Sequence, residues 1–189
     1  MSNTLSRPSA AAGNTLAPSN ILDIGCGANK SSGAIGIDRM KQPGVDVIHD
    51  LNRTPWPFAD NTFEIIVCQD TIQILDSILD TMNEIHRIAK PGAAVKIRTP
   101  HYSHPNSWKD PLHKWHLAFD SFDYFLEDFG YPKYTDRTYR MLKKEFIFNR
   151  KFGMGNLLAQ ISPRRYEKYY AHRYPPYNMY FELEVIKNA

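Results

Sequence analysis

The chain has 189 residues, a formal net charge of +3 and two cysteines, Cys26 and Cys68. Lysine and arginine number 23 against 20 aspartates and glutamates, a balance too even for a dedicated nucleic-acid-binding protein. Two cysteines do not make a disulfide framework, and the sequence has neither a secretory segment nor an apolar run long enough to span a bilayer. Composition thus argues against secreted, disulfide-rich and membrane-spanning classes, and we expect a globular protein of the cytoplasm.

Residues 1–20 are mostly small or polar and bury too little to offset the entropy of ordering them, so we expect a flexible tail. A transit peptide is an alternative, because the segment is free of acids, but it holds a single basic residue, Arg7. We expect the rest of the chain, residues 21–189, to form a single domain.

Short apolar runs bounded by Gly, Pro, Asp or Asn follow the tail and predict β-strands. They lie at Ile21–Gly25, Ala34–Asp38, Val45–Asp50, Phe63–Cys68 and Ala93–Arg98. Several lack a clean alternation of apolar and polar residues, which is typical of strands covered on both faces of a parallel sheet.

Helical periodicity is clearest at Asp76–Ala89, where apolar residues recur every three or four positions. Asp76 is placed to cap this helix, and the pair Pro91-Gly92 is placed to end it. A second amphipathic helix is predicted at Asp120–Asp128.

Two further segments near the C-terminus, Lys144–Arg150 and Tyr180–Lys187, alternate in polarity and predict a closing pair of strands. Strands that alternate with helices along a chain are typical of α/β proteins. We therefore predict a doubly wound, mostly parallel sheet with an antiparallel edge strand.

The first predicted strand runs into a Gly-x-Gly turn at Gly25 and Gly27, where the absence of a Cβ lets a ligand approach the backbone. A plain tight turn would look the same. A dinucleotide-binding fingerprint is disfavoured, because it needs Gly or Ala at the position of Lys30 and a helix that receives the pyrophosphate. The connection Ala28–Ala34 is short even for a minimal crossover.

Acidic residues mark the first three predicted strands. Asp38 closes the second strand, where a carboxylate can accept both hydroxyls of a ribose, and Asp50 closes the third, where it suits an exocyclic adenine amine. Together with Asp23 they would face the carboxyl edge of the sheet, where open α/β sheets bind ligands. Three acids suit a cationic nucleoside; the alternative is that each one caps a loop.

Five collinear segments within residues 20–100 resemble the class I S-adenosylmethionine-dependent methyltransferases. The segments are Leu22–Gly27, Gly36–Asp38, Asp50-Leu51, Pro57–Glu64 and Glu84–Gly92. The chain lacks the usual helix after the glycine turn, and in this it is similar to a small bacterial subgroup in which this crossover is shortened. The resemblance implies a Rossmann-like fold with S-adenosylmethionine as cofactor.

The resemblance also implies roles for residues at the first two strand ends. Gly25 and Gly27 would line the methionine and ribose parts of the cofactor, and Asp23 would approach its amino end. Asp38 would hold the ribose.

At the next strand ends, Asp50 and the backbone of Leu51 would read the adenine. Gln69 and Asp70 would flank the amino-acid part and the transferable methyl group. Where many relatives carry a Glu-His pair shortly afterwards, this chain has Gln73 and Ile74, so no catalytic role is carried over to that position.

Four of the seven histidines fall within residues 101–116, after the fifth predicted strand. Histidine titrates near neutral pH, so we expect His101 or His104 to act as a general base or to position the acceptor. A structural, hydrogen-bonded loop is the alternative. The spacing of the histidines with Asp110 matches no strong metal-binding motif, and we expect no metal.

Residues 151–180 hold five basic residues, one acidic residue and six of the eleven tyrosines. This basic, tyrosine-rich insertion, at about 151–179, could bind nucleic acid, lie at a membrane surface, cover the substrate or pack its tyrosines on the sheet. The run Tyr174-Pro175-Pro176-Tyr177 resembles an element of amino-methyltransferases that act on nucleic-acid bases. It lies over a hundred residues after the fourth predicted strand, which that element follows, so the match is rejected.

The sequence thus predicts an S-adenosylmethionine-dependent methyltransferase that acts on oxygen or nitrogen of a small-molecule, glycosylated or lipid-linked acceptor. One alternative is a nucleic-acid methyltransferase that uses the 151–180 surface. Another is a non-catalytic protein that binds the cofactor. Peripheral contact with a membrane and the oligomeric state stay open.

Overall fold

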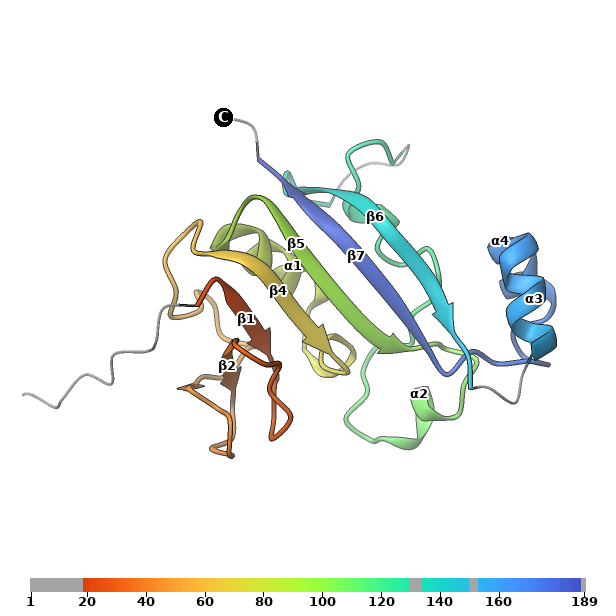
Figure 1. Cartoon of the computed structure of the whole chain (residues 1–189), viewed down its shortest axis with the longest axis horizontal. Coiled ribbons are helices and arrows are strands. Elements are labelled where there is room, and N and C mark those ends of the chain that lie inside the picture. The colour runs from red at the N-terminus through yellow and green to blue at the C-terminus, as the bar shows by residue number, and fades with distance from the viewer. Residues whose placement is uncertain (1–18, 130–133, 150–152, 188–189) are drawn as a thin grey trace, which may run out of the picture.

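A computed structural model describes residues 19–129, 134–149 and 153–187, so the predicted tail lies outside the described residues except for its last two. Seven strands form one sheet in the order β3-β2-β1-β4-β5-β7-β6 (Figure 1). Their bounds are β1 Ile21–Ile24, β2 Ile35–Asp38, β3 Val47–Ile48, β4 Phe63–Gln69, β5 Ala89–Pro100, β6 Thr138–Ile147 and β7 Asn178–Ile186.

Strands β3, β2, β1, β4 and β5 pair in parallel, whereas β7 is antiparallel to both of its neighbours, β5 and β6. The predicted α/β fold with a mostly parallel sheet and an antiparallel edge is therefore confirmed. The predicted strands are all present, but β5 begins four residues early, at Ala89, and β6 begins at Thr138 rather than Lys144.

The two faces of the sheet differ in β4, β5 and β7, where burial alternates along each strand. Cys68, Ile97 and Phe181 are buried in the core, which also holds the apolar face of helix α1 (Ile78–Ile88). Lys96 and its register partner Glu182 lie on the other face and are partly exposed. The expectation of burial on both faces holds for β1, whose last three residues are all buried, but not for β4 and β5, whose second face is partly exposed. The β1–β2 and β2–β3 connections are too short to hold helices over that face.

Helix α1 differs from its predicted bounds at both ends. Ser77, not Asp76, caps it, since the Ser77 hydroxyl accepts a hydrogen bond from the Asp80 N–H at 3.1 Å. The chain passes directly from Ile88 into β5, so Pro91-Gly92 lies within a strand and does not end the helix. The ammonium group of Lys187 donates to the Ala89 carbonyl at 2.7 Å and ties the end of β7 to this junction.

The helix predicted at Asp120–Asp128 is wrong, because the segment contains one short 3₁₀ helix, η2 (Asp123–Phe125). Its acids are engaged elsewhere: the Lys144 ammonium on β6 lies 2.6 Å from Asp120 and 2.7 Å from Asp123. These long-range ion pairs hold the segment against the sheet in an irregular conformation.

The remaining helices are short: η1 Ile72–Ile74, α2 Asn106–Lys109, α3 Gly153–Ile161 and α4 Pro163–Tyr169. Helices α3 and α4 pack on the end of β6 around Tyr166, which is fully buried. Over the described part of the chain, no helix combines the length and the apolar character that crossing a bilayer requires.

Candidate functional site

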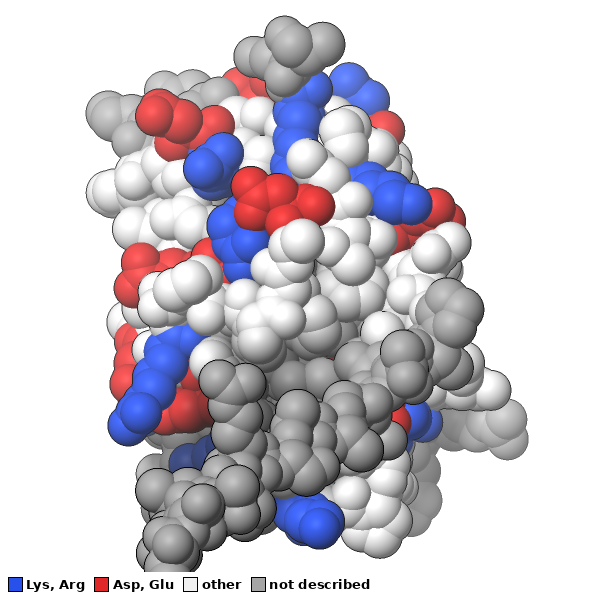
Figure 2. Space-filling view, turned by 90° about the vertical axis from the view of Figure 1, so that its left-hand side faces the viewer, with Lys and Arg blue, Asp and Glu red and all other residues white. Residues whose placement is uncertain are grey.

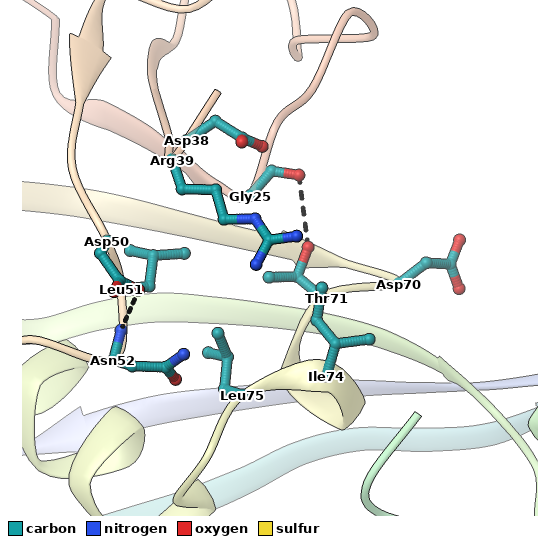
Figure 3. A pocket seen from close by; sticks show the side chains of 10 residues that line it. All are labelled: Gly25, Asp38, Arg39, Asp50, Leu51, Asn52, Asp70, Thr71, Ile74 and Leu75. Carbon is teal, nitrogen blue, oxygen red and sulfur yellow. Dashed lines mark hydrogen bonds between the residues drawn. The ribbon is translucent and has the colours of Figure 1, made fainter. Parts of the chain in front are cut away.

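The order of the strands reverses between β1 and β4, and ligands of open α/β sheets bind at the carboxyl ends of the strands beside such a reversal. A cavity lies there, with about 550 Å³ of open space including its mouth (Figure 3). Its lining residues are Gly25, Asp38, Arg39, Asp50, Leu51, Asn52, Asp70, Thr71, Ile74 and Leu75.

Gly25 ends β1 in a conformation and a space that favour glycine. Its φ is +65°, and its N–H donates to the Ile37 carbonyl of β2 at 2.8 Å. A Cβ at Gly25 would lie 2.3 Å from Thr71 Cγ2 and from Thr71 Oγ1. The glycine therefore lets the turn after β1 lie directly against the turn after β4 and leaves its backbone open to the cavity.

Two carboxylates, Asp38 and Asp50, line the cavity. Asp38 accepts the Gly27 N–H on Oδ2 and the Met40 N–H on Oδ1, each at 3.0 Å, which fixes its orientation. Asp50 accepts the Asn52 N–H on Oδ1 at 3.1 Å. A carboxylate has about four lone-pair sites, so both side chains keep acceptor capacity for a ligand.

Leu51, Ile74 and Leu75 form an apolar wall of the cavity, and Figure 3 shows Leu51 beside Asp50. Leu51 is held from behind, since the Trp56 indole N–H donates to its carbonyl at 3.0 Å. The Trp56 N–H in turn donates to the Glu84 carboxylate on α1 at 2.8 Å.

Glu84 and Arg87 form the support behind this wall. They pair at 2.8 Å, and the Arg87 guanidinium also donates to the Phe58 and Trp56 carbonyls. Two of the segments that carry the family resemblance, Pro57–Glu64 and Glu84–Gly92, thus fix the wall of the cavity and do not line it.

Asp70 follows β4 with φ +51°, and Figure 3 shows its side chain turned away from the other lining residues. Its carboxylate lies 2.5 Å from the Arg98 guanidinium of β5. Asp70 therefore lines the cavity while its carboxylate is paired with Arg98.

Three residues expected at the cofactor do not line this cavity: Asp23, Gly27 and Gln69. Asp23 is buried on the other face of the sheet, where its carboxylate accepts the Ser31 N–H at 2.7 Å and holds the short β1–β2 connection. The Gly27 N–H donates to Asp38, so Gly27 acts through that residue. Gln69 lines a separate cavity with Lys96, Arg98 and Tyr180.

Neither cysteine offers a nucleophile. Burial raises the pKa of the Cys26 thiol to about 11, with Asp23 and Asp38 adding to the effect, and burial raises the pKa of Cys68 to about 12. Both thiols therefore stay protonated at neutral pH, which argues against a covalent step on cysteine.

His101 is fully buried at the end of β5 and does not line the cavity. Its Nε2 lies 2.9 Å from the Glu167 carboxylate on α4, and its Nδ1 lies 2.8 Å from the Ser103 hydroxyl. Both ring nitrogens therefore have protein partners, and the geometry gives His101 a structural role that links β5 to α4.

His104 is partly exposed, and its ring centroid lies 5.1 Å from that of Tyr177. Its Nδ1 accepts the Asn106 N–H at 3.1 Å. Burial lowers the pKa of His104, and the charges of Lys109 and His101 lower it further, so the ring is neutral at pH 7. His104 therefore has the protonation state that a general base needs, although it does not line the cavity.

The other two histidines of this stretch, His113 and His116, both contact Ser107. His113 Nδ1 lies 3.0 Å from the Ser107 carbonyl, and His116 Nδ1 lies 2.9 Å from the Ser107 hydroxyl. Within the described ranges, His, Cys, Asp and Glu side chains do not gather in groups of three that could hold a metal ion.

Sequence reasoning missed five lining residues: Arg39, Asn52, Thr71, Ile74 and Leu75. Arg39, Asn52 and Thr71 directly follow predicted site residues, so extending each strand end by one position would have found them. Ile74 and Leu75 reach the cavity through η1, whose short 3₁₀ turn has no clear periodic pattern.

The donor set fits S-adenosylmethionine. Asp38 and Asp50 offer carboxylates that suit ribose hydroxyls and an amine, and Leu51, Ile74 and Leu75 offer an apolar wall that suits a flat base. The acids also favour a cation, and glycine at position 25 avoids the collision with Thr71 that any Cβ there would cause.

Comparison with known proteins agrees with this geometry. The sequence matches the family described as a methyltransferase domain over residues 4–139, more than half of the chain. The bifunctional methionine biosynthesis protein MetXA/MetW of Rhodopirellula baltica is 27% identical; the match covers 50% of this chain and about a fifth, 20%, of that relative.

Two solved structures are similar in fold. An S-adenosylmethionine-dependent methyltransferase from Archaeoglobus fulgidus matches with a TM-score of 0.57 and 17% identity, covering 88% of this chain and 86% of that one. A chain from the complex between the Haloferax volcanii methyltransferase activator Trm112 and a methyltransferase matches with a TM-score of 0.58 and 14% identity, covering 90% and 84%. The chain belongs to the methyltransferase-domain family and has the fold of S-adenosylmethionine-dependent methyltransferases, as its motifs predicted.

Proposed function

We propose that this methyltransferase binds S-adenosylmethionine in the cavity between β1 and β4 and methylates an oxygen or nitrogen atom of a small-molecule, glycosylated or lipid-linked acceptor. The observation that carries the proposal is the placement of Gly25, Asp38 and Asp50 around one cavity at the reversal of strand order. When bound, the cofactor supplies an electrophilic methyl group on a sulfonium sulfur.

The residues of the chain bind the cofactor and orient it toward the acceptor. Asp38 would hold the ribose, and Asp50 with the Leu51 backbone would hold the adenine against Ile74 and Leu75. The Gly25 backbone and Asp70 would flank the amino-acid part. Fixing the acceptor in line with the methyl group is the main contribution of the protein, because alignment alone can supply several kcal/mol.

His104 is the proposed general base. It belongs to the segment after β5, which leaves the same sheet edge as the cavity, and its lowered pKa keeps it able to accept a proton at neutral pH. His101 carries the same proposal with less support, because Glu167 and Ser103 already occupy its ring nitrogens.

Charge supports a small acceptor over a nucleic acid. The net charge is +3, and Figure 2 shows basic and acidic side chains interspersed among the described residues that are visible on the side that carries β1 and β2. Binding to a phosphate backbone needs a basic surface and is weakened by salt.

Titration calorimetry with S-adenosylhomocysteine tests the proposal, followed by a screen of acceptors that measures release of that product from S-adenosylmethionine. We expect binding by the wild type and turnover with a hydroxyl or amine acceptor. Absence of binding would refute the cofactor site. Binding with no turnover across alcohols, amines, sugars and lipid-linked acceptors would favour the non-catalytic alternative.

A further inference from the structure

Helix α3 carries an exposed apolar stripe. Met154, Leu157 and Ile161 recur at helical spacing and are 55%, 53% and 73% exposed. The helix packs on the protein through other residues, because Gly155 and Ala159 are buried near Phe148 and Tyr174 and Leu158 is partly buried beside them. It contains no charged residue. An apolar side of a short helix is thus turned to solvent, where it is unfavourable.

Helix α4, which follows after Ser162, adds unpaired positive charge. Arg165 and Lys168 are exposed, and neither forms an ion pair with an acid of the described residues. Glu167, the acid of this helix, is turned inward to His101 and to the Phe119 N–H. Arg165 lies four residues after Ile161, so free cations follow the apolar stripe directly.

Exposed tyrosines lie at the end of α4. Tyr169 and Tyr170 are 65% and 43% exposed at the end of α4, and the Lys168 ammonium lies 5.1 Å from the centre of the Tyr169 ring. Amphipathic rings beside basic side chains are typical of segments that lie at the boundary between lipid headgroups and acyl chains.

The α3–α4 unit, residues 153–170, is attached firmly to the ligand edge of the sheet. The Tyr166 hydroxyl donates to the Tyr174 carbonyl at 2.5 Å, and the Ser103 hydroxyl donates to the Ala171 carbonyl at 3.0 Å. The His101–Glu167 contact ties α4 to the carboxyl end of β5, which is the neighbour of β4. In Figure 1 the arrowheads of β4, β5 and β6 point in the same direction, and α3 and α4 lie beyond the arrowhead of β6.

We propose that the α3–α4 unit docks the protein on an anionic lipid surface. Met154, Leu157 and Ile161 would enter the interface, while Arg165 and Lys168 would contact the headgroups, so the protein would lie on the membrane without spanning it. Charge complementarity selects this occupant, because an apolar stripe followed by unpaired cations matches a surface that is both apolar and negative. The further step, that docking brings the cavity to a lipid-linked acceptor, rests on the proposed function.

Vesicle sedimentation tests the proposal. The full chain is mixed with vesicles of phosphatidylcholine alone or of phosphatidylcholine with phosphatidylglycerol. We expect binding to the anionic vesicles and a loss of roughly tenfold or more in both the double variant Leu157→Gln, Ile161→Gln and the double variant Arg165→Gln, Lys168→Gln. Leu142→Gln, at a residue 54% exposed on β6, is the apolar control and should bind like the wild type.

Lys41→Gln is the charge control, since Lys41 is exposed in the β2–β3 connection at the opposite end of the strand order. A wild type that stays in the supernatant with both vesicles would overturn the proposal, as would variants that bind like the wild type. A wild type that self-associates but does not bind vesicles, and that loses self-association in Leu157→Gln, Ile161→Gln, would assign the stripe to a second copy. A wild type that binds RNA but not vesicles, and that loses RNA binding in Arg165→Gln, Lys168→Gln, would assign the cations to nucleic acid.

Calorimetry with S-adenosylhomocysteine separates this inference from the proposed function. Both double variants should keep wild-type affinity for that product, and their melting temperatures should match the wild type because the substituted side chains are exposed. Vesicle binding by a protein without affinity for the product would leave docking intact and refute the cofactor site. Product binding without vesicle binding would leave the cofactor site intact and refute docking.

Discussion

The turn at Gly25 and the side chain of Thr71 pack so closely that a Cβ on the glycine would lie 2.3 Å from two Thr71 atoms. This contact joins the carboxyl ends of β1 and β4 at the point where the strand order reverses. Whatever separates the two turns also changes the cavity between them.

We therefore expect Gly25→Ala to abolish measurable binding of S-adenosylhomocysteine. The new Cβ meets Thr71, and a positive φ adds backbone strain of about 1–3 kcal/mol. Gly33→Ala is a matched control: Gly33 also has a positive φ, +73°, but nothing lies within 4 Å of its Cβ position. Calorimetry should show wild-type affinity for Gly33→Ala, with a lower melting temperature in both variants. Equal affinities in the two variants would contradict the steric argument.

Asp38→Asn should weaken binding of the product by roughly tenfold to a hundredfold, since hydrogen bonds to a charged group contribute about 1.5–3 kcal/mol. Asp23→Asn is the informative comparison. The resemblance places Asp23 at the amino end of the cofactor, whereas in the structure its carboxylate holds the Ser31 N–H on the other face. We expect a lower melting temperature for Asp23→Asn and an affinity within a fewfold of the wild type. A loss as large as that of Asp38→Asn would restore Asp23 to the site.

Strand ends were the most predictable part of the site. In a parallel sheet the carboxyl ends meet at one edge, so Asp38, Asp50 and Asp70 reach one cavity although they are far apart in sequence. The direction of a side chain within a strand was harder to predict. Asp23 lies inside β1 and points to the opposite face from the core residue Ile24, as alternation along a strand requires.

Long-range contacts account for the other failures. The helix predicted at Asp120–Asp128 is replaced by a 3₁₀ turn whose acids pair with Lys144 on β6, and Arg164 on α4 also reaches Asp120, at 2.9 Å. His101 looks like a catalytic residue in the sequence because its partner Glu167 is 66 positions away. Local patterns do not contain such partners, and burial depends on them.

His101→Ala tests the structural role of this histidine. Loss of the link to Glu167 leaves a mostly buried carboxylate with the Phe119 N–H as its remaining partner, so we expect a loss of about 1–3 kcal/mol in the free energy of unfolding. Affinity for S-adenosylhomocysteine should be unchanged. Glu167→Gln keeps an oxygen that can accept both hydrogen bonds and should be less destabilising. Wild-type stability with a large loss of turnover in His101→Ala would instead support the catalytic role.

His104→Gln should lower methyl transfer by roughly a hundredfold and leave product affinity intact, if the histidine removes a proton from the acceptor. Because its pKa is lowered, the wild-type rate should rise with pH through a value below about 6.5 and stay level at neutral pH. The rate is followed with the acceptor identified in the screen. A wild-type rate independent of pH, together with normal turnover in His104→Gln, would leave alignment alone to explain the transfer.

His86 predicts how stability depends on pH. Its Nε2 donates to the Ile186 carbonyl at 2.9 Å, and its buried Nδ1 has no hydrogen-bond partner among the described residues. Burial lowers the pKa of His86 in the folded state, with Lys187 and Arg137 lowering it further. The unfolded chain therefore takes up the proton first as pH falls.

The free energy of unfolding should thus be level above the unfolded pKa of about 6.5 and should fall below it, by at most about 1.4 kcal/mol per pH unit for one proton. His104 contributes in the same direction, since its pKa is also lowered. Urea denaturation at about pH 7.5 and about pH 5.5 measures the difference. In His86→Gln, which keeps a donor for the Ile186 carbonyl but does not titrate, the difference should shrink. The control His172→Gln, at an exposed histidine, should retain the wild-type difference, and an unchanged difference in His86→Gln would contradict the assignment.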